Sequence, residues 1–154
     1  MDFLKELLGN AQDLSSLLPD LNQVLTDLIP VIRFTVLLGP AVLLIMGLVY
    51  LFLAPKEANH TLGFRCWWGM SSMEVWQFTQ KLAGIVWGGL GIILAIVAII
   101  GCVIMVGQEL SKATSTALTI LIIEAVAALL AFLTVEITVI LRYDMNGSAR
   151  KKKK

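Results

Sequence analysis

The sequence predicts an all-α integral membrane protein with three transmembrane helices. Hydrophobic residues make up 58% of the 154 residues and charged residues only 15%, whereas a soluble domain is about half apolar and about a quarter charged. The apolar residues gather in three runs, each close to the roughly 20 residues that a helix needs to cross the hydrocarbon core. Because these runs are continuous rather than alternating, they favour helices over the strands of a membrane barrel.

The apolar runs divide the chain into three parts. The predicted spans extend from about Val31 to Leu53, from about Gly84 to Val106 and from about Ala117 to Leu141. We therefore expect an amphipathic N-terminal arm over residues 1–30, a three-helix transmembrane module over residues 31–142 and a basic tail over residues 143–154.

The N-terminal arm carries leucine and alanine at alternating spacings of three and four from Leu4 to Leu28, which is a heptad seam. Pro19 interrupts the seam, because proline removes a helix donor and clashes with the preceding turn. Two short helices, about 3–17 and 19–29, are therefore predicted. The arm either presents a surface to a partner or another copy, or lies on the bilayer as an amphipathic segment; the second interpretation is favoured.

The distribution of lysine and arginine predicts the orientation. Three spans place the termini on opposite sides of the membrane, and the side richer in these residues is cytoplasmic. With the C-terminus inside, nine basic residues face the cytoplasm and three face outward. The loop after the first span is then cytoplasmic and the arm external. The inner set is Lys56, Arg65, Lys81, Arg142, Arg150 and residues 151–154, and the outer set is Lys5, Arg33 and Lys112.

The loop before the second span contains a helix-start signal. Ser71 followed three residues later by Glu74 is a capping-box pattern, which predicts a helix from about Ser72. Trp76 and Gln80 would lie on one flank of this cytoplasmic, interfacial loop-helix. The helix either runs into the second span or bends at the first glycine of that span.

The stretch from Asn59 to Gly84 resembles the signature of the SdpI family of bacterial membrane proteins. In that family an Asn is followed by Gly, an apolar or aromatic residue and Arg, then a Ser/Met-containing turn, Glu, Trp and a short basic helix that ends in Ala-Gly. One span before the loop and two after it also fit the family's module, so the resemblance covers roughly residues 35–142. The matching residues are Asn59, Gly63, Phe64, Arg65, Met70, Ser71, Glu74, Trp76, Phe78, Lys81, Ala83 and Gly84.

The chain departs from the family pattern in two ways. Cys66-Trp67 follows the arginine where members usually have Thr-Pro or a similar pair, which changes the expected turn geometry. Longer members carry six spans, whereas this chain has the three-span module alone.

The resemblance implies a protein of the bacterial cell membrane that gives immunity to a secreted peptide toxin (bacteriocin resistance), signals by binding a cytoplasmic regulator, or does both. The resemblance implies the toxin and the regulator as partners. Membrane lipids are expected as well, a homo-oligomer stays open, and no direct contact with nucleic acid is expected. Two alternatives stay open: a transport or channel component that uses intramembrane carboxylates, and a structural subunit of a larger membrane complex.

Two residue sets are candidates for binding. Arg65 either grips a carboxylate or lipid phosphate or pairs with Glu74 and fastens the loop to its helix. Asn59 and His60 bind either the turn backbone or a ligand, and the turn interpretation is favoured. A single histidine without acidic or cysteine partners gives no metal signature, so no metal or other cofactor is expected.

Three ionisable residues fall within the apolar runs: Arg33, Glu124 and Glu136. Charged groups at this depth are costly and mark protein interiors, cavities or transport routes. Glu124 and Glu136 are twelve residues apart, about 18 Å along a helix, so they cannot form a close catalytic pair. The similar depth of Arg33 and Glu124 predicts an ion pair, with a proton or substrate relay as the competing hypothesis.

Other patterns argue against an enzyme. The sequence contains no phosphate loop, nucleotide fingerprint, nucleophile elbow or HExxH motif. Cys66 and Cys102 are far apart and are predicted to be free thiols. The second span has a small-residue face, interpreted as internal packing rather than dimerisation, that consists of Gly84, Gly88, Gly89 and Gly91.

Overall fold

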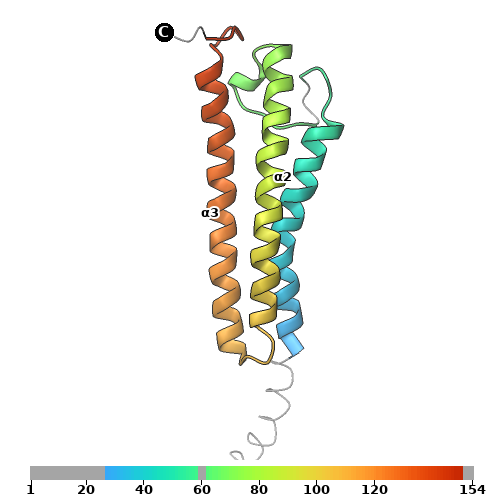
Figure 1. The fold of residues 1–154 in the computed structure, drawn as a ribbon, viewed down its shortest axis with the longest axis vertical. Helices are drawn as coiled ribbons and strands as arrows, with labels where there is room; N and C mark the ends of the chain where they lie inside the picture. The colour runs from blue at the N-terminus through green and yellow to red at the C-terminus, as the bar shows by residue number, and fades with distance from the viewer. Residues whose placement is uncertain (1–26, 59–61, 151–154) are drawn as a thin grey trace, which may run out of the picture.

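The computed structural model describes residues 27–58 and 62–150 and contains three long helices (Figure 1). The first span covers Asp27–Leu53, α2 covers Met73–Ile104 and α3 covers Leu110–Arg142. Among the described residues, extended pairing is confined to one isolated bridge. The predicted all-α class with three spans is thus confirmed. Residues 1–26, which make up most of the predicted arm, and the four terminal lysines lie outside the described residues.

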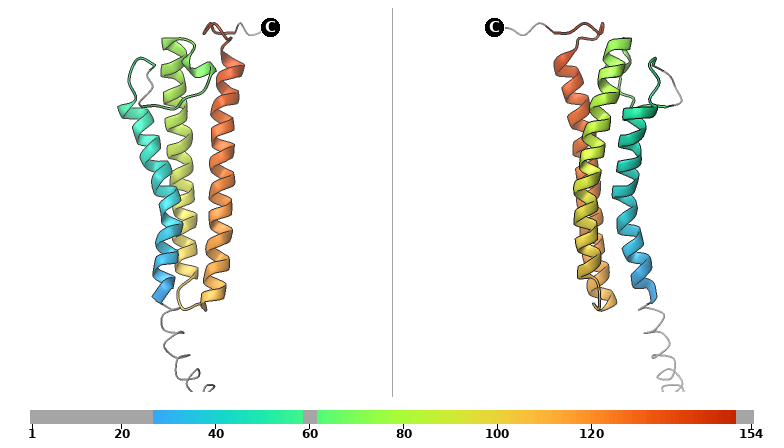
Figure 2. Two further views of the ribbon diagram at one scale, coloured as in Figure 1. Left: turned by 180° about the vertical axis from the view of Figure 1, so that it is seen from behind. Right: turned by 45° about the vertical axis from the view of Figure 1, so that its right-hand side comes forward.

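The three helices stand side by side and run up, down and up (Figures 1 and 2). A short connection over residues 105–109 joins α2 to α3 at one end of the bundle. A longer loop, residues 54–72, joins the first span to α2 at the other end, where α3 also ends. We call this second end, formed by residues 54–72 and 143–150, the loop end. The loop and the C-terminal segment therefore lie on one side of any membrane that the bundle crosses.

All three helices are long and apolar enough to cross a membrane. Each has an 18-residue window with a mean hydropathy of 2.6, and only 22–28% of each window is buried inside the bundle. The remaining apolar side chains point outward along the whole bundle. Hydrocarbon accommodates such a surface, whereas water does not. The protein is therefore a multi-pass membrane protein.

The helices extend beyond the predicted spans. α2 has 32 residues, about 48 Å at 1.5 Å per residue, whereas the hydrocarbon core is about 30 Å thick. Hydropathy detects only the apolar part of such a helix, which is why the sequence predicted a span from Gly84. The segment from Met73 continues into the span without a bend. The described part of the first span starts at Asp27 and α3 begins at Leu110, so both also extend ahead of the predicted starts.

Glycines bring the first span and α2 into backbone contact. A Cβ on Gly47 would lie 2.5 Å from the amide nitrogen of Gly88, and a Cβ on Gly91 would lie 2.8 Å from that of Leu44. A Cβ on Gly84 would collide with the Leu51 side chain. Such close approach is characteristic of packed membrane helices. The small-residue face of α2 therefore packs within the chain, as the sequence interpretation favoured.

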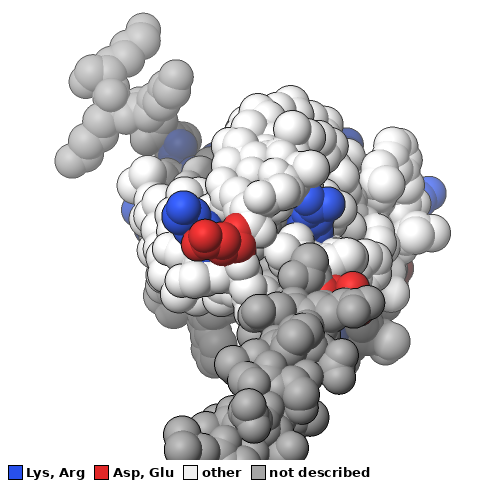
Figure 3. Space-filling model, turned by 90° about the horizontal axis from the view of Figure 1, so that it is seen from below, with Lys and Arg blue, Asp and Glu red and all other residues white. Residues whose placement is uncertain are grey.

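The buried core falls into two clusters, one at each end of the bundle. The cluster at the loop end contains Tyr50, Phe64, Cys66, Val75, Ala83, Val135, Val139 and Tyr143. The other contains Ile29, Val36, Ala98, Met105, Ala113, Ala117 and Ile120. Loop residues enter only the first cluster, so the loop is an integral part of the fold. At the end of the bundle opposite the loop, the described surface is mostly uncharged, with scattered basic and acidic side chains (Figure 3).

Candidate functional site

Phe64 anchors the loop in the helix bundle. Its side chain is 3% exposed. Its ring lies among Tyr50 of the first span, Trp87 of α2 and Phe132 of α3, with centroid separations of 5.9, 6.1 and 5.3 Å. Edge-to-face and tilted ring contacts of this kind add to the stabilisation from burial alone. One loop residue thus contacts all three helices.

The Gln80 side chain fixes the backbone of the same loop residue. Its Oε1 accepts a hydrogen bond from the Phe64 N–H at 2.7 Å, and its Nε2 donates one to the Phe64 carbonyl at 2.8 Å. Buried backbone groups need hydrogen-bond partners, and the Gln80 amide, itself only 3% exposed, supplies them for Phe64. Gly63, the residue before Phe64, has a φ of 122°, a conformation that favours glycine. A Cβ there would also lie 2.7 Å from the Trp76 ring.

Two further hydrogen bonds tie the start of the loop to α2. The fully buried Trp76 donates from Nε1 to the Pro55 carbonyl at 2.8 Å. Gln77 donates from Nε2 to the Lys56 carbonyl at 3.3 Å. Trp76 and Gln80 therefore lie on one flank of α2, as their spacing predicted, and this flank faces the loop. Trp76 of the family motif has a structural role.

Cys66 closes the turn that leads into α2. Its Sγ accepts a hydrogen bond from the Gly69 N–H at 3.3 Å. Burial raises the pKa of the Cys66 thiol above its ordinary value; the Gly69 N–H opposes the rise and the Glu136 carboxylate adds to it. The thiol therefore stays protonated near neutral pH and acts as a buried structural group rather than a nucleophile.

The start of α2 differs from the predicted capping box. The N-cap is Ser72, whose hydroxyl accepts a hydrogen bond from the Val75 N–H at 3.3 Å. Ser71 donates its hydroxyl to the Trp68 carbonyl at 2.7 Å and so closes the preceding 3-10 turn, η2 (Trp68–Met70). Glu74 lies exposed in the first turn of α2, where a carboxylate stabilises the positive end of the helix dipole.

The C-terminal segment packs over this helix start. The Arg142 guanidinium lies 4.4 Å from the centroid of the Phe78 ring, a cation–π contact. The following turn is held by Asp144 Oδ1, which accepts hydrogen bonds from the N–H groups of Asn146 and Ser148. A Cβ on Gly147, which has φ of 78°, would lie 2.6 Å from Ser72 Cβ. α3, its C-terminal turn and the loop therefore form one packed unit.

The anchored loop leaves two large side chains on its surface. From Phe64 to Trp67 the residues alternate between buried and exposed, so Arg65 and Trp67 point outward. Trp67 is 80% exposed. The hypothesis of an Arg65–Glu74 staple is wrong, because no ion pair joins these two exposed residues in the described part of the chain and Gln80 and Phe64 hold the loop instead. Arg65 is left available to bind an anionic group.

Glu124 lies deep between α3 and the first span. It is 6% exposed, and its Oε1 is buried without a hydrogen-bond partner among the described residues. Its Oε2 packs so closely on Gly39 that a Cβ there would collide with it. The carboxylate borders a groove of about 370 Å³ whose other lining residues are apolar.

The predicted Arg33–Glu124 ion pair is wrong, since the two side chains form no ion pair in the described structure. Glu124 packs at the level of Gly39, six residues beyond Arg33, which is about 9 Å along a helix. The Arg33 carbonyl accepts a hydrogen bond from the Cys102 thiol at 3.6 Å. The Nε of the Arg33 side chain lacks a hydrogen-bond partner among the described residues. Glu136 is half-buried near Cys66, about 18 Å along α3 from Glu124.

The remaining candidates lie apart or outside the described residues. Lys81 is exposed on α2, and Gly84 packs on the first span. Asn59 and His60 lie outside the described residues. The described cysteine and acidic residues form no group of three that would hold a metal ion. Phe64 and Gln80 hold the loop against the helices, and the sequence analysis gave neither residue this role. The one sequence pattern that could have indicated it is the spacing that places Gln80 beside Trp76.

Comparison with known proteins agrees with the resemblance seen in the sequence. The model of the SdpI/YfhL protein family matches residues 55–136, a little more than half of the chain. The match begins at the proline whose carbonyl binds Trp76 and ends at Glu136 of α3. Comparison with curated proteins gave no match, and comparison with solved structures gave none.

Proposed function

This chain belongs to the SdpI/YfhL family, and from that premise we propose that it gives a bacterial cell immunity to a secreted peptide toxin, signals by binding a regulator at the cytoplasmic face, or does both. Its mode of action is binding rather than turnover. The observation that carries the proposal is the anchored loop, which buries Phe64 and presents Arg65 and Trp67 at the surface.

Anchoring lowers the cost of binding. A free loop loses conformational entropy when a partner orders it, whereas a loop already held in one conformation does not. The two hydrogen bonds from Gln80 and the contacts of the Phe64 ring fix the backbone on which Arg65 stands. Arginine and tryptophan are also the residue types that contribute most to binding at protein interfaces. A partner with a carboxylate or phosphate beside an apolar patch fits this surface.

The arrangement of basic residues supports a cytoplasmic loop end. Lys56, Arg65, Lys81, Arg142 and Arg150 all belong to the loop end or to the helix turns beside it. At the opposite end, Lys112 and Arg33 are the basic residues among those described. This bias fits the positive-inside rule and would give a regulator access to the loop.

The test is survival of a sensitive Gram-positive strain exposed to a panel of secreted peptide toxins, with and without the protein. Arg65→Ala is compared with Lys112→Ala, which removes an exposed charge at the opposite end. Both variants are expressed at the same membrane level as wild type. We expect wild type and Lys112→Ala to protect and Arg65→Ala to lose protection. Full protection by Arg65→Ala would remove the loop surface from the mechanism.

Proton or ion transport is a second candidate function, favoured by Glu124. A buried carboxylate whose Oε1 has no hydrogen-bond partner among the described residues, beside an apolar groove, resembles the intramembrane carboxylates of proton pathways. Proteoliposomes with a pH-sensitive dye test this candidate. Transport predicts proton flux that Glu124→Gln abolishes, and Arg65→Ala should leave that flux unchanged. Liposomes containing wild type that are as tight as empty ones would reject it.

A further inference from the structure

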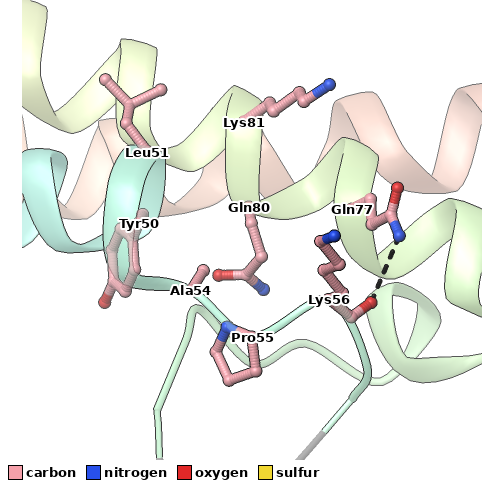
Figure 4. A pocket seen from close by; sticks show the side chains of 8 residues that line it. All are labelled: Tyr50, Leu51, Ala54, Pro55, Lys56, Gln77, Gln80 and Lys81. Carbon is pink, nitrogen blue, oxygen red and sulfur yellow. Dashed lines mark hydrogen bonds between the residues drawn. The ribbon is translucent and has the colours of Figure 1, made fainter.

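A polar cleft of about 460 Å³ opens at the loop end between the first span and α2 (Figure 4). One wall comes from Tyr50 and Leu51 in the last turn of the first span and from Ala54, which follows that span. The other comes from α2, with Gln77 and Lys81, and Lys56 of the loop closes the rim. The cleft lies beside the surface that carries Arg65 and does not include that residue.

The chemistry of the lining suits an anion with an apolar attachment. Lys56 and Lys81 contribute two positive charges, and none of the lining residues is acidic. The side-chain amides on α2 add polar atoms. Leu51 and Ala54 supply an apolar wall on the side of the first span. An anionic lipid has a phosphate that fits the two lysines and a hydrocarbon chain that fits the apolar wall. A free phosphate would contact only the lysines and the polar side chains.

The cleft is held open by contacts of the surrounding residues. The hydrogen bonds from Trp76 to the Pro55 carbonyl and from Gln77 to the Lys56 carbonyl fix the chain that carries Lys56. On the opposite wall, Leu51 packs directly against Gly84. The separation of the two walls is therefore set by the fold before any ligand binds.

The depth of the cleft matches the lipid headgroups. The apolar first span ends at Leu53, and Lys56 follows within three residues. Lys81 lies three residues before Gly84, where the predicted apolar run of α2 begins. Both ammonium groups are thus at the edge of the hydrocarbon, where long basic side chains reach phosphate groups. Basic pockets between membrane helices at this level bind anionic headgroups.

We propose that this cleft binds the phosphate headgroup of an anionic phospholipid, with Lys56 and Lys81 on the phosphate and Leu51 and Ala54 against the adjoining chain. The site is separate from the toxin or regulator surface and does not depend on the immunity function. It would fasten the loop-end half of α2 to the membrane surface beside the first span.

The test measures lipid binding to the purified full-length chain. Wild type, Lys56→Gln, Lys81→Gln, the double variant and the control Lys112→Gln are placed in phosphatidylcholine nanodiscs with added phosphatidylglycerol. Retained phosphatidylglycerol is then counted by native mass spectrometry. Each cleft lysine is expected to contribute about fivefold to affinity, and the control should match wild type. The basic tail is present in every variant, so its attraction for anionic lipid cancels.

A second arm separates the two sources of phosphate. Inorganic phosphate is added to the protein in pure phosphatidylcholine, and thermal unfolding is followed by circular dichroism. The proposal predicts no stabilisation by inorganic phosphate and a clear one by phosphatidylglycerol that the double variant loses. Equal phosphatidylglycerol retention by the double variant and the control would overturn the proposal. Stabilisation by inorganic phosphate alone would also overturn it, in favour of a soluble ligand.

Discussion

Replacing Gln80 by alanine should destabilise the protein more than any exposed polar substitution at the loop end. The change removes both partners of the buried Phe64 backbone, which now bind the Gln80 amide at 2.7 and 2.8 Å. Each buried backbone group left unsatisfied costs about 1–3 kcal/mol, so the pair should cost about 2–6 kcal/mol. Gln80 also borders the polar cleft. Water that enters there would bring the loss toward the lower limit.

The assay is reversible unfolding in mixed micelles, followed by far-ultraviolet circular dichroism. Tryptophan fluorescence is avoided because the substitution changes the surroundings of a tryptophan directly. Gln77→Ala is the matched control, because Gln77 is exposed and makes one 3.3 Å hydrogen bond to the Lys56 carbonyl. It should lose about 0.5 kcal/mol or less, as exposed substitutions usually do. Gln80→Glu adds a second comparison, since it keeps an acceptor for the Phe64 N–H but has no donor for the carbonyl. If Gln80→Ala and Gln77→Ala lose the same free energy of unfolding, the loop is not anchored as described.

Four further experiments test other parts of the structure. Gly63→Ala should cost about 1–3 kcal/mol, because alanine at φ of 122° is strained. Gly89→Ala, where the described structure leaves space for a Cβ, should stabilise α2 by about 0.5–1 kcal/mol in the same unfolding assay. Gly39→Ala should destabilise through its clash with Glu124, and Gly39→Ala with Glu124→Ala should cost less than the sum of the single changes; additive losses would contradict the contact. Alkylation of Cys66, in a background without the other cysteine, should begin at a higher pH than for a free thiol, because burial raises its pKa. The matching stability contribution is fully present below the ordinary thiol pKa and is lost as pH rises through the higher folded pKa.

Hydrophobicity alone was enough to predict the three spans, because a run of apolar residues has few other places to fold. Hydrophobicity underestimated the lengths of the helices. It stopped at Gly84, whereas the Ser/Glu pattern predicted a helix from about Ser72, and the structure confirms that helix from Met73. The helix continues into the span because Gly84 packs on Leu51 instead of breaking it. Helix length beyond the hydrocarbon depends on caps and on packing between spans, and hydropathy contains neither.

The sequence singled out the loop before α2 as the candidate site but did not predict the contacts within that loop. The i, i+4 spacing placed Trp76 and Gln80 on one flank. Their partners lie 21 and 16 residues away along the chain, at separations that no local pattern encodes. The predicted Arg33–Glu124 ion pair failed for a different reason. Counting from span ends matched Arg33 with Glu124 in depth but ignored helix register, which brings Glu124 to Gly39.

The central claim is that the surface of the anchored loop contacts the protein's partner. Photo-crosslinking in living cells tests it directly, with a photoreactive amino acid at position 67 and, as a control, at position 103 near the opposite end of α2, where the native side chain is 66% exposed. Cells that the protein protects are irradiated with and without toxin. We expect a toxin-dependent crosslink to a peptide or protein from position 67, absent from position 103 and lost in Arg65→Ala. Protection without any such crosslink from position 67, or an identical crosslink in Arg65→Ala, would contradict it.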